Sequence, residues 1–184
     1  MKSLISPIAT LLAILTALTD IGILLYFLSV PLQTLRNRIL TTIAPYARIL
    51  AFIVALAATS GSLFYSEIAQ YTPCLLCWWQ RIFMYPQVLL LSMGILKNDK
   101  HIADYSIGMS SVGFIIALYH YYIQLGGKTF LTCGQVGFSA SCTQRFTMEF
   151  GYITIPMMSL TAFAAILLLM RISKRMANGL PGAR

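Results

Sequence analysis

Five long apolar stretches dominate the sequence and restrict what the chain can fold into. They cover about residues 8–30, 47–66, 78–96, 103–125 and 152–170. A helix needs about 20 mainly apolar residues to cross the roughly 30 Å hydrocarbon core of a bilayer. Only 10% of the residues are charged, whereas a soluble domain has about a quarter. The sequence therefore predicts an all-α, polytopic membrane protein with five spans and no separate soluble domain.

The positive charges indicate how these spans are oriented. Lysine and arginine collect in the short cytoplasmic loops of membrane proteins. Here the basic residues cluster at 36–48, at 97–101 and after residue 170, and with five spans these segments fall on one side. The loops at about 67–77 and 126–151 then lie outside the cytoplasm, and they contain all four cysteines. Because these clusters account for the net charge of +8, no nucleic-acid partner is expected.

The first apolar stretch has an alternative interpretation as a cleaved signal peptide, because Lys2 precedes it. It is longer than an ordinary signal core, no A-x-A-like site follows it, and cleavage would leave Arg36 and Arg38 outside. We therefore expect a retained span. Asp20 lies near its middle, where an acid is costly, so it is either functional, protonated or paired with a neighbouring helix. Residues 31–45 are expected to form a basic linker.

The third span begins with Cys74-Leu-Leu-Cys77. The i,i+3 spacing places both sulfurs on one face of a helix start, where the helix dipole favours a thiolate. Arg81 follows one turn later on the same face, where a guanidinium would stabilise a thiolate or an oxyanion on a bound carbonyl compound. The alternative is an arginine that extends to the membrane interface. Its register with Cys77 favours a functional role.

Cys133 and Cys142 enclose a short segment rich in small residues. A loop of this size can close a disulfide, and taken alone it is most simply a structural staple. The CxxC on the same side adds another interpretation, because two disulfides within reach can exchange by thiolate attack. Four cysteines could also hold zinc through four thiolates. A CxxC that begins an apolar helix outside the cytoplasm favours disulfide chemistry, so no metal is predicted.

The fourth span ends with two polar side chains, His120 and Gln124, near the side that carries the cysteines. Their i,i+4 spacing places them on one helix face, and polar side chains at membrane depth point into the bundle or a cavity. They could donate hydrogen bonds to a quinone carbonyl, or they could form interhelical hydrogen bonds. The pattern alone leaves both interpretations open.

Short motifs spread over about residues 47–170 carry a family resemblance: GSLFYSE at 61–67, PCLLCWWQRI at 73–82, MYP at 84–86, Tyr119-His120 and GYITIP at 151–156. They resemble the DsbB/BdbC family of disulfide bond formation proteins, and BdbC members most closely. The resemblance implies a four-helix bundle in the bacterial plasma (inner) membrane. Such a bundle oxidises a DsbA-like thiol oxidase of thioredoxin fold and passes the electrons to a membrane quinone, either ubiquinone or menaquinone.

The resemblance also implies a division of the chain. Residues 46–172 would form the four-helix redox core, and 173–184 a cytoplasmic tail. Residues 1–45, an additional transmembrane span with its linker, are not part of the family pattern. The interval between the second pair of cysteines is also shorter than in DsbB proper, and resembles the compact BdbC-type members.

By position, the resemblance assigns a role to each cysteine. Cys133 would form a mixed disulfide with the partner, and Cys142 would release it. Cys142 would then pair transiently with Cys74, which frees Cys77 to donate electrons to the quinone with Arg81 stabilising the adduct. His120 and Gln124 match positions near the quinone site of the family.

Two other functions remain open at this point. A vitamin K epoxide reductase-like protein also combines a helical bundle, two cysteine pairs and a quinone, but it places its loop pair before its CxxC. A membrane scaffold with purely structural disulfides would have the same composition. Static disulfides would never form a mixed disulfide with a partner, so thiol trapping separates a scaffold from an enzyme.

Overall fold

The computed structural model describes residues 2–99, 101–128 and 141–177. Helices make up most of these residues, and the only strand pairing among them is an isolated bridge between Glu149 and Ile153. In chain order the α-helices are α1 (Lys2–Leu28), α2 (Gln33–Ile43), α3 (Ala47–Leu63), α4 (Leu75–Leu96), α5 (Ile102–Gln124) and α6 (Ile155–Ala177). A short π-helical turn, Phe64–Ile68, extends α3. The predicted all-α fold is confirmed.

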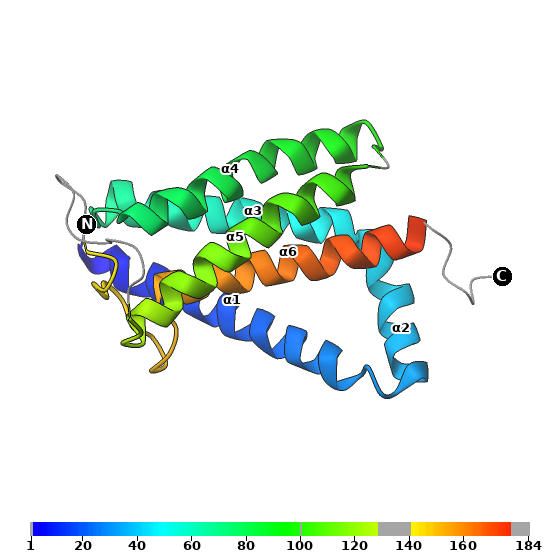
Figure 1. Cartoon of the computed structure of the whole chain (residues 1–184), viewed down its shortest axis with the longest axis horizontal. Helices are drawn as coiled ribbons and strands as arrows, with labels where there is room; N and C mark the ends of the chain where they lie inside the picture. Colours follow the sequence, from blue (N-terminus) through cyan, green and yellow to red (C-terminus); the bar gives the residue numbers. More distant parts are fainter. Residues whose placement is uncertain (1, 100, 129–140, 178–184) are drawn as a thin grey trace.

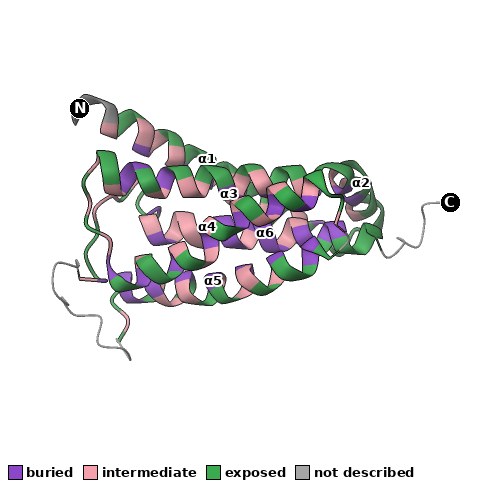
Figure 2. Ribbon diagram, turned by 90° about the horizontal axis from the view of Figure 1, so that it is seen from above, coloured by how far each residue is buried: buried purple, intermediate pink, exposed green. Residues whose placement is uncertain are grey.

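Helices α3, α4, α5 and α6 form a four-helix bundle, in which each helix packs against two neighbours. Its core is apolar and includes Leu91, Phe163 and Met170, all fully buried. Figure 2 shows the buried residues facing the interior of this bundle, whereas from Ile5 onward few residues of α1 are buried and the rest are half-buried or exposed. Helix α1 lies outside the bundle and packs mainly along α6. The predicted core of four helices with one extra N-terminal helix is confirmed.

Four of the helical segments within the described ranges are long and apolar enough to cross a membrane: Ile5–Leu28, Gln33–Ile68, Ile102–Gln124 and Ile155–Ala177. The chain is thus a multi-pass membrane protein. Helix α4 is one residue shorter than α5 and packs between α3 and α5. Its polar residues lower its hydropathy, and it is not among these four.

The polar residues of α4 face the protein. Gln87 is fully buried; its Nε2 donates to Ser110 at 2.8 Å, and its Oε1 accepts from Ser106 at 2.6 Å. Both serines belong to α5. The low hydropathy of α4 therefore reflects polar side chains that find their partners inside the bundle, as expected for polar groups at membrane depth.

The predicted basic linker at residues 31–45 contains a helix that was not predicted from the sequence, since Gln33–Ile43 forms α2. No glycine or proline interrupts this segment, and Leu40 is buried against Ala44, Ala47 and Ile172. Packing of one apolar face thus stabilises a helix where charge and flanking prolines alone indicated a connector. Figure 1 shows α2 crossing one end of the bundle, the end opposite the N-terminus.

The last helix also differs from the expected span. It begins at Ile155 and continues to Ala177, so the first five residues of the predicted tail at 173–184 are helical. Lys174 and Arg175 lie in its last turn, where positive charge interacts favourably with the helix dipole. Apolar residues alone therefore do not mark where this helix ends.

Helices α5 and α6 approach closely where Gly113 faces Phe163. A Cβ atom at Gly113 would lie 2.3 Å from the Phe163 ring, whereas one at Gly108 would meet nothing within 4 Å. We expect Gly113→Ala to destabilise the protein by about 1–3 kcal/mol through overpacking. Gly108→Ala, on the same helix, should stabilise it by about 1 kcal/mol or less, through helix propensity alone. Unfolding of the purified protein in mixed micelles measures both, and equal effects would contradict the close approach.

Candidate functional site

Cys74 and Cys77 form a close pair at the start of α4. Cys74 is the N-cap residue, with extended backbone angles, and its sulfur accepts the backbone N–H of Cys77 at 3.3 Å. The two sulfurs are 2.8 Å apart and both thiols are free. Since a disulfide needs about 2.0 Å, a two-electron oxidation could join them with only a small movement of the sulfurs. We call Cys74 and Cys77 the inner pair.

The environment of Cys74, which precedes the first residue of α4, favours its thiolate. Its pKa is lowered to about 5, because the Cys77 thiol donates to it and because His120 interacts with it, and these effects outweigh burial. The backbone N–H of Cys77 contributes in the same direction. At neutral pH this sulfur is therefore a thiolate, the form that takes part in disulfide exchange.

This lowered pKa predicts a pH profile. In protein with the inner pair reduced, thiolate absorbance and alkylation of Cys74 should rise with a midpoint near pH 5, whereas an ordinary thiol titrates near about 8.5. His120→Leu should move the midpoint upward, because one stabilising partner of the thiolate is lost. Mass spectrometry identifies the alkylated cysteine. A midpoint unchanged by His120→Leu would contradict the contact with His120.

His120 lies between the inner pair and the loop that carries Cys142. Its Nε2 is 3.2 Å from the carbonyl oxygen of Cys142 and 3.6 Å from the sulfur of Cys74. A carbonyl only accepts, so Nε2 carries the proton. Nδ1 then accepts from the side-chain amide of Gln80 at 2.9 Å. Gln80 thus fixes the tautomer in which His120 donates toward both cysteines.

Cys142 is disulfide-bonded and buried in a cluster with Cys74, Leu76 and Ile123. Cys133, the other member of what we call the outer pair, lies outside the described residues. The backbone of Cys142 is nevertheless placed directly over α5, with His120 donating to its carbonyl oxygen. Both the inner pair and Cys142 therefore lie at the same end of the bundle.

Gln124 also holds the loop that follows Cys142. Its Nε2 donates to the carbonyl oxygen of Gln144 at 3.0 Å, and Arg145 donates to the carbonyl oxygen of Gln124. Gln124 lines a small pocket of about 20 Å³ together with Cys74 and Gln144. The i,i+4 pair predicted on α5 thus shares one face, and in this structure that face supports the loop.

A larger cavity, the main cavity, lies on the other side of the inner pair. Its volume is about 350 Å³, within the range of about 300–1,000 Å³ typical of small-molecule sites. Cys77, Gln80, Arg81 and His120 line it, whereas Cys74 and Gln124 do not. The two cysteines of the inner pair therefore have different surroundings: Cys74 borders the Cys142 loop alone, whereas Cys77 borders that loop and the main cavity.

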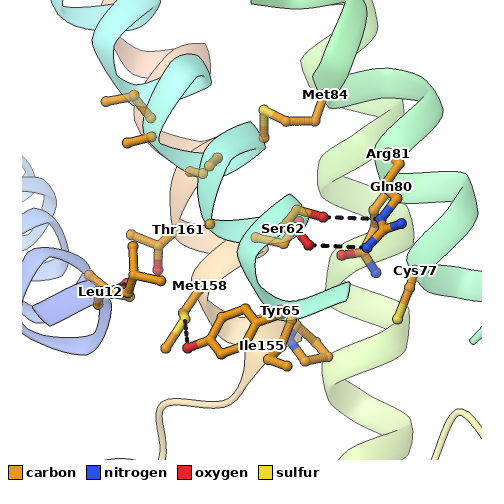
Figure 3. Close-up of a pocket in the computed structure, with 18 of the residues that line it drawn as sticks. Leu12, Ser62, Tyr65, Cys77, Gln80, Arg81, Met84, Ile155, Met158 and Thr161 are labelled. Atoms are coloured by element: carbon orange, nitrogen blue, oxygen red, sulfur yellow. Dashed lines mark hydrogen bonds between the residues drawn. The ribbon is translucent and has the colours of Figure 1, made fainter. Parts of the chain in front are cut away.

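Arg81 is held in the wall of the main cavity by α3 (Figure 3). Its Nε donates to the hydroxyl of Ser62 at 3.0 Å, and one terminal nitrogen donates to the Ser62 carbonyl oxygen at 3.2 Å. The hydroxyl of Tyr85 also donates to Ser62, at 3.0 Å. The guanidinium lies 5.1 Å from the centre of the Trp78 ring. These contacts place a fixed positive charge in the cavity wall one turn after Cys77.

The same end of the bundle contains a possible set of metal donors. The ligand atoms of Cys74, Cys77 and His120 all lie within 4.8 Å of one another. The four-thiolate zinc site considered from sequence is not formed, because Cys142 is disulfide-bonded. Cys74, Cys77 and His120 are instead linked to one another and to Gln80 by hydrogen bonds. This arrangement suits thiol chemistry.

Two residues that contribute to this arrangement had no role assigned from sequence. Gln80 precedes Arg81 in the PCLLCWWQRI motif, and Ser62 lies in the GSLFYSE motif. The sequence did contain a signal for Gln80: an amide one turn after Cys77 lies at membrane depth, where polar groups need hydrogen-bond partners. Ser62 gave no comparable signal, since serine is common where membrane helices pack together.

Comparisons with known proteins agree with this architecture. The family model "Disulfide bond formation protein DsbB" matches residues 45–172. The "Probable disulfide formation protein C" of Halalkalibacterium halodurans is 46% identical over 121 residues, covering 63% of this chain and 84% of the relative. The "Disulfide bond formation protein C" of Bacillus subtilis is 37% identical over 126 residues, covering 67% and 89%. No solved structure gives a significant match.

One further relative shows how much of the chain lies outside this common core. The "Probable disulfide formation protein C 2" of Bacillus anthracis is 37% identical over 141 residues, covering 99% of the relative but 76% of this chain. The family match begins at residue 45, after α1 and α2. With both cysteine-bearing regions inside the matched residues, the chain belongs to the DsbB family of disulfide bond formation proteins.

Proposed function

We propose that this protein is a quinone-dependent thiol oxidase that regenerates the disulfide of a DsbA-like partner outside the cytoplasm of a bacterium. The observation that carries the proposal is that the two cysteines of the inner pair have different surroundings. Cys74 borders the Cys142 loop alone, whereas Cys77 borders that loop and also lines the main cavity together with Arg81. A pair arranged in this way can accept electrons on one side and release them on the other.

The partner's electrons would enter through the outer pair. A thiolate of the partner attacks Cys133 and breaks the Cys133–Cys142 bond, and the partner's second thiolate then releases Cys133. The partner becomes a disulfide, and Cys133 and Cys142 become a dithiol carrying two electrons. Each exchange replaces one sulfur–sulfur bond with another.

The inner pair would receive these electrons by the same chemistry. The Cys142 thiolate attacks the Cys74–Cys77 disulfide at Cys74 and releases Cys77, and Cys133 then closes on Cys142 and frees Cys74. The cluster that buries Cys74 against Cys142 supports attack at Cys74. His120 supports it as well, because its Nε2 donates toward both residues. A disulfide-bonded Cys142 beside two free thiols corresponds to the completed transfer.

The main cavity fits an aromatic electron acceptor. It offers a thiol at Cys77, a fixed cation at Arg81 and an imidazole at His120, with mainly apolar residues around them. A quinone, when bound, accepts the two electrons and two protons that leave as the Cys74–Cys77 disulfide forms again. Arg81 holds positive charge where negative charge develops, and Gln80 keeps the proton of His120 on Nε2. Gln124 supports the Cys142 loop in this scheme.

The topology follows from charge and helix count. With α4 as a fifth span, the inner pair and Cys142 lie outside the cytoplasm. Helix α2 and the end of α6 then lie on the cytoplasmic side. The positions of Arg36, Arg38 and Arg175 in these two segments agree with the positive-inside rule. We retain the division into 1–45, a redox core at 46–172 and a tail at 173–184. The family match over residues 45–172 supports the core.

The proposal is tested by quinone reduction. Purified protein, supplied with a reduced DsbA-like protein and a quinone analogue, should reduce the analogue and oxidise the partner in equal amounts. A well-folded protein that fails to reduce any quinone would overturn the proposal. Thiol trapping separates an enzyme from a scaffold. In Cys142→Ala mixed with the partner in its disulfide form, the Cys133 thiolate should attack the partner's disulfide, release one partner thiolate and accumulate as a mixed disulfide, which purely structural cysteines would not form.

Labelling tests the topology independently. A membrane-impermeant thiol reagent, added to reduced intact cells, should modify Cys133 or Cys142. Modification only after the cytoplasmic side is opened would contradict the extracytoplasmic placement of the outer pair, and with it the proposed partner.

A further inference from the structure

Helix α1 packs on the core through one face of small residues. Ala9, Ala13 and Thr16 are buried, and with Asp20 they follow the three- and four-residue spacing of one helix face. Small residues let membrane helices approach closely. The opposite face carries Leu11 and other leucines that are more than half exposed. Helix α1 thus has a defined protein-facing side, although it precedes the family match at residue 45.

Two specific contacts fix the position of α1. Thr161 of α6 donates to Asp20 at 2.7 Å, so the costly acid in this span is paired with a neighbouring helix. Leu12 packs against α3 at Gly61, where an added Cβ would lie 3.3 Å from its Cδ1 atom. Helix α1 is therefore held against both α6 and α3.

This face of α1 lines the main cavity. Leu12, Leu15, Thr16 and Thr19 all contribute to the cavity wall, and Figure 3 shows Leu12 on the side away from Cys77 and Arg81. The hydroxyls of Thr16 and Thr19 donate to carbonyl oxygens of α1 itself, at 2.8 Å each. Because these hydroxyls already have hydrogen-bond partners, the wall that α1 provides requires no polar group on a ligand.

The main cavity consequently has two chemically different ends. Cys77, Arg81 and His120 stand at one end, where a polar ring would be recognised, and α1 closes the other end with apolar surface. We infer, resting on the proposed function, that the end closed by α1 binds the first part of the polyprenyl tail of the quinone whose ring lies at Cys77. Continuity with the redox end favours a tail attached to that ring over an independent lipid chain. The four-helix core alone leaves this end without its α1 wall.

The inference is tested by comparing two quinones with the same ring, one without a tail and one with a polyprenyl tail. The full-length protein is placed in phosphatidylcholine nanodiscs, and binding is followed by quenching of its two tryptophans, Trp78 and Trp79, which adjoin Cys77. Thr16→Phe fills the end bounded by α1. It should weaken binding of the tailed quinone about tenfold or more, through overpacking, and leave the tail-free quinone unchanged. Thr10→Phe, the matched control on the same helix, should change neither, because Thr10 does not line the cavity.

A tailed quinone with a photoreactive group on its first prenyl units gives a second readout, independent of the variants. It should label the α1 peptide that contains Leu12 and Thr16. Labelling only of phospholipid, or equal binding of the tailed quinone to wild type and Thr16→Phe, overturns the inference and leaves the proposed function intact. Equal weakening of both quinones by Thr16→Phe also overturns it. If neither the tailed nor the tail-free quinone binds the wild-type protein, the proposed function itself fails.

Discussion

Cys77→Ala is expected to lower quinone-dependent oxidation of the partner by about 10³-fold or more, the scale seen when a covalent catalytic group is removed. Cys77 is the member of the inner pair that lines the main cavity. Without it the inner disulfide cannot form, so no electron pair can leave through the cavity. The measurement is the steady-state rate of quinone reduction with a reduced DsbA-like partner.

The control for this prediction is Cys74→Ala, which removes the other sulfur of the same pair. Both variants should lose steady-state turnover, but they should accumulate different species. Cys77→Ala retains the sulfur beside Cys142 and should trap a Cys74–Cys142 disulfide. Cys74→Ala should trap Cys77 with Cys142 to a smaller extent, because Cys142 is buried in one cluster with Cys74, whereas Cys77 also borders the main cavity. Equal trapping in the two variants would show that Cys142 does not exchange preferentially with Cys74.

Arg81→Met should lower kcat/KM for the quinone by about 10²-fold, the usual effect of removing one stabilising group at a site of developing charge. The guanidinium is held by two hydrogen bonds to Ser62 beside Cys77, and methionine retains much of its volume without its charge. Arg81→Lys should recover part of the loss, because lysine keeps the charge but cannot reproduce the two-nitrogen contact. Stopped-flow measurement of quinone reduction provides the rate.

The first half-reaction serves as the internal control for Arg81. Formation of the mixed disulfide between the partner and Cys133 should proceed in Arg81→Met at the wild-type rate, because Arg81 contacts α3 and not the Cys142 loop. A loss of equal size in both half-reactions would indicate general damage to the bundle and would remove the assigned role. Ser62→Ala, which keeps the charge but releases the guanidinium, should have a smaller effect than Arg81→Met.

Much of the fold could be predicted because membrane helices show strong sequence signals. The long apolar stretches, the CxxC at a helix start and Arg81 one turn later are all local patterns. The helix within the segment at 31–45 was not predicted, because it depends on Leu40 packing against Ile172, a contact distant in sequence. The start and end of α6 were likewise set by the whole molecule, since apolarity alone does not mark a helix end.

The candidate site was predictable in its residue types but not in its contacts. Spacing placed His120 and Gln124 on one helix face, yet it could not say that Gln124 would bond to the backbone of Gln144. Gln80 depends on His120, which lies on a different helix. The difference between Cys74 and Cys77 arises from what lies on each side of α4, and spacing within one helix contains no such information.

The buried polar residues of α4 have a consequence for how the protein is made. Gln87 is satisfied only by Ser106 and Ser110, both on α5. An isolated α4 in hydrocarbon would leave this amide unpaired, at a cost of several kcal/mol. During synthesis α4 is therefore expected to remain beside the translocon until α5 has emerged, and the two helices should enter the bilayer as one hairpin.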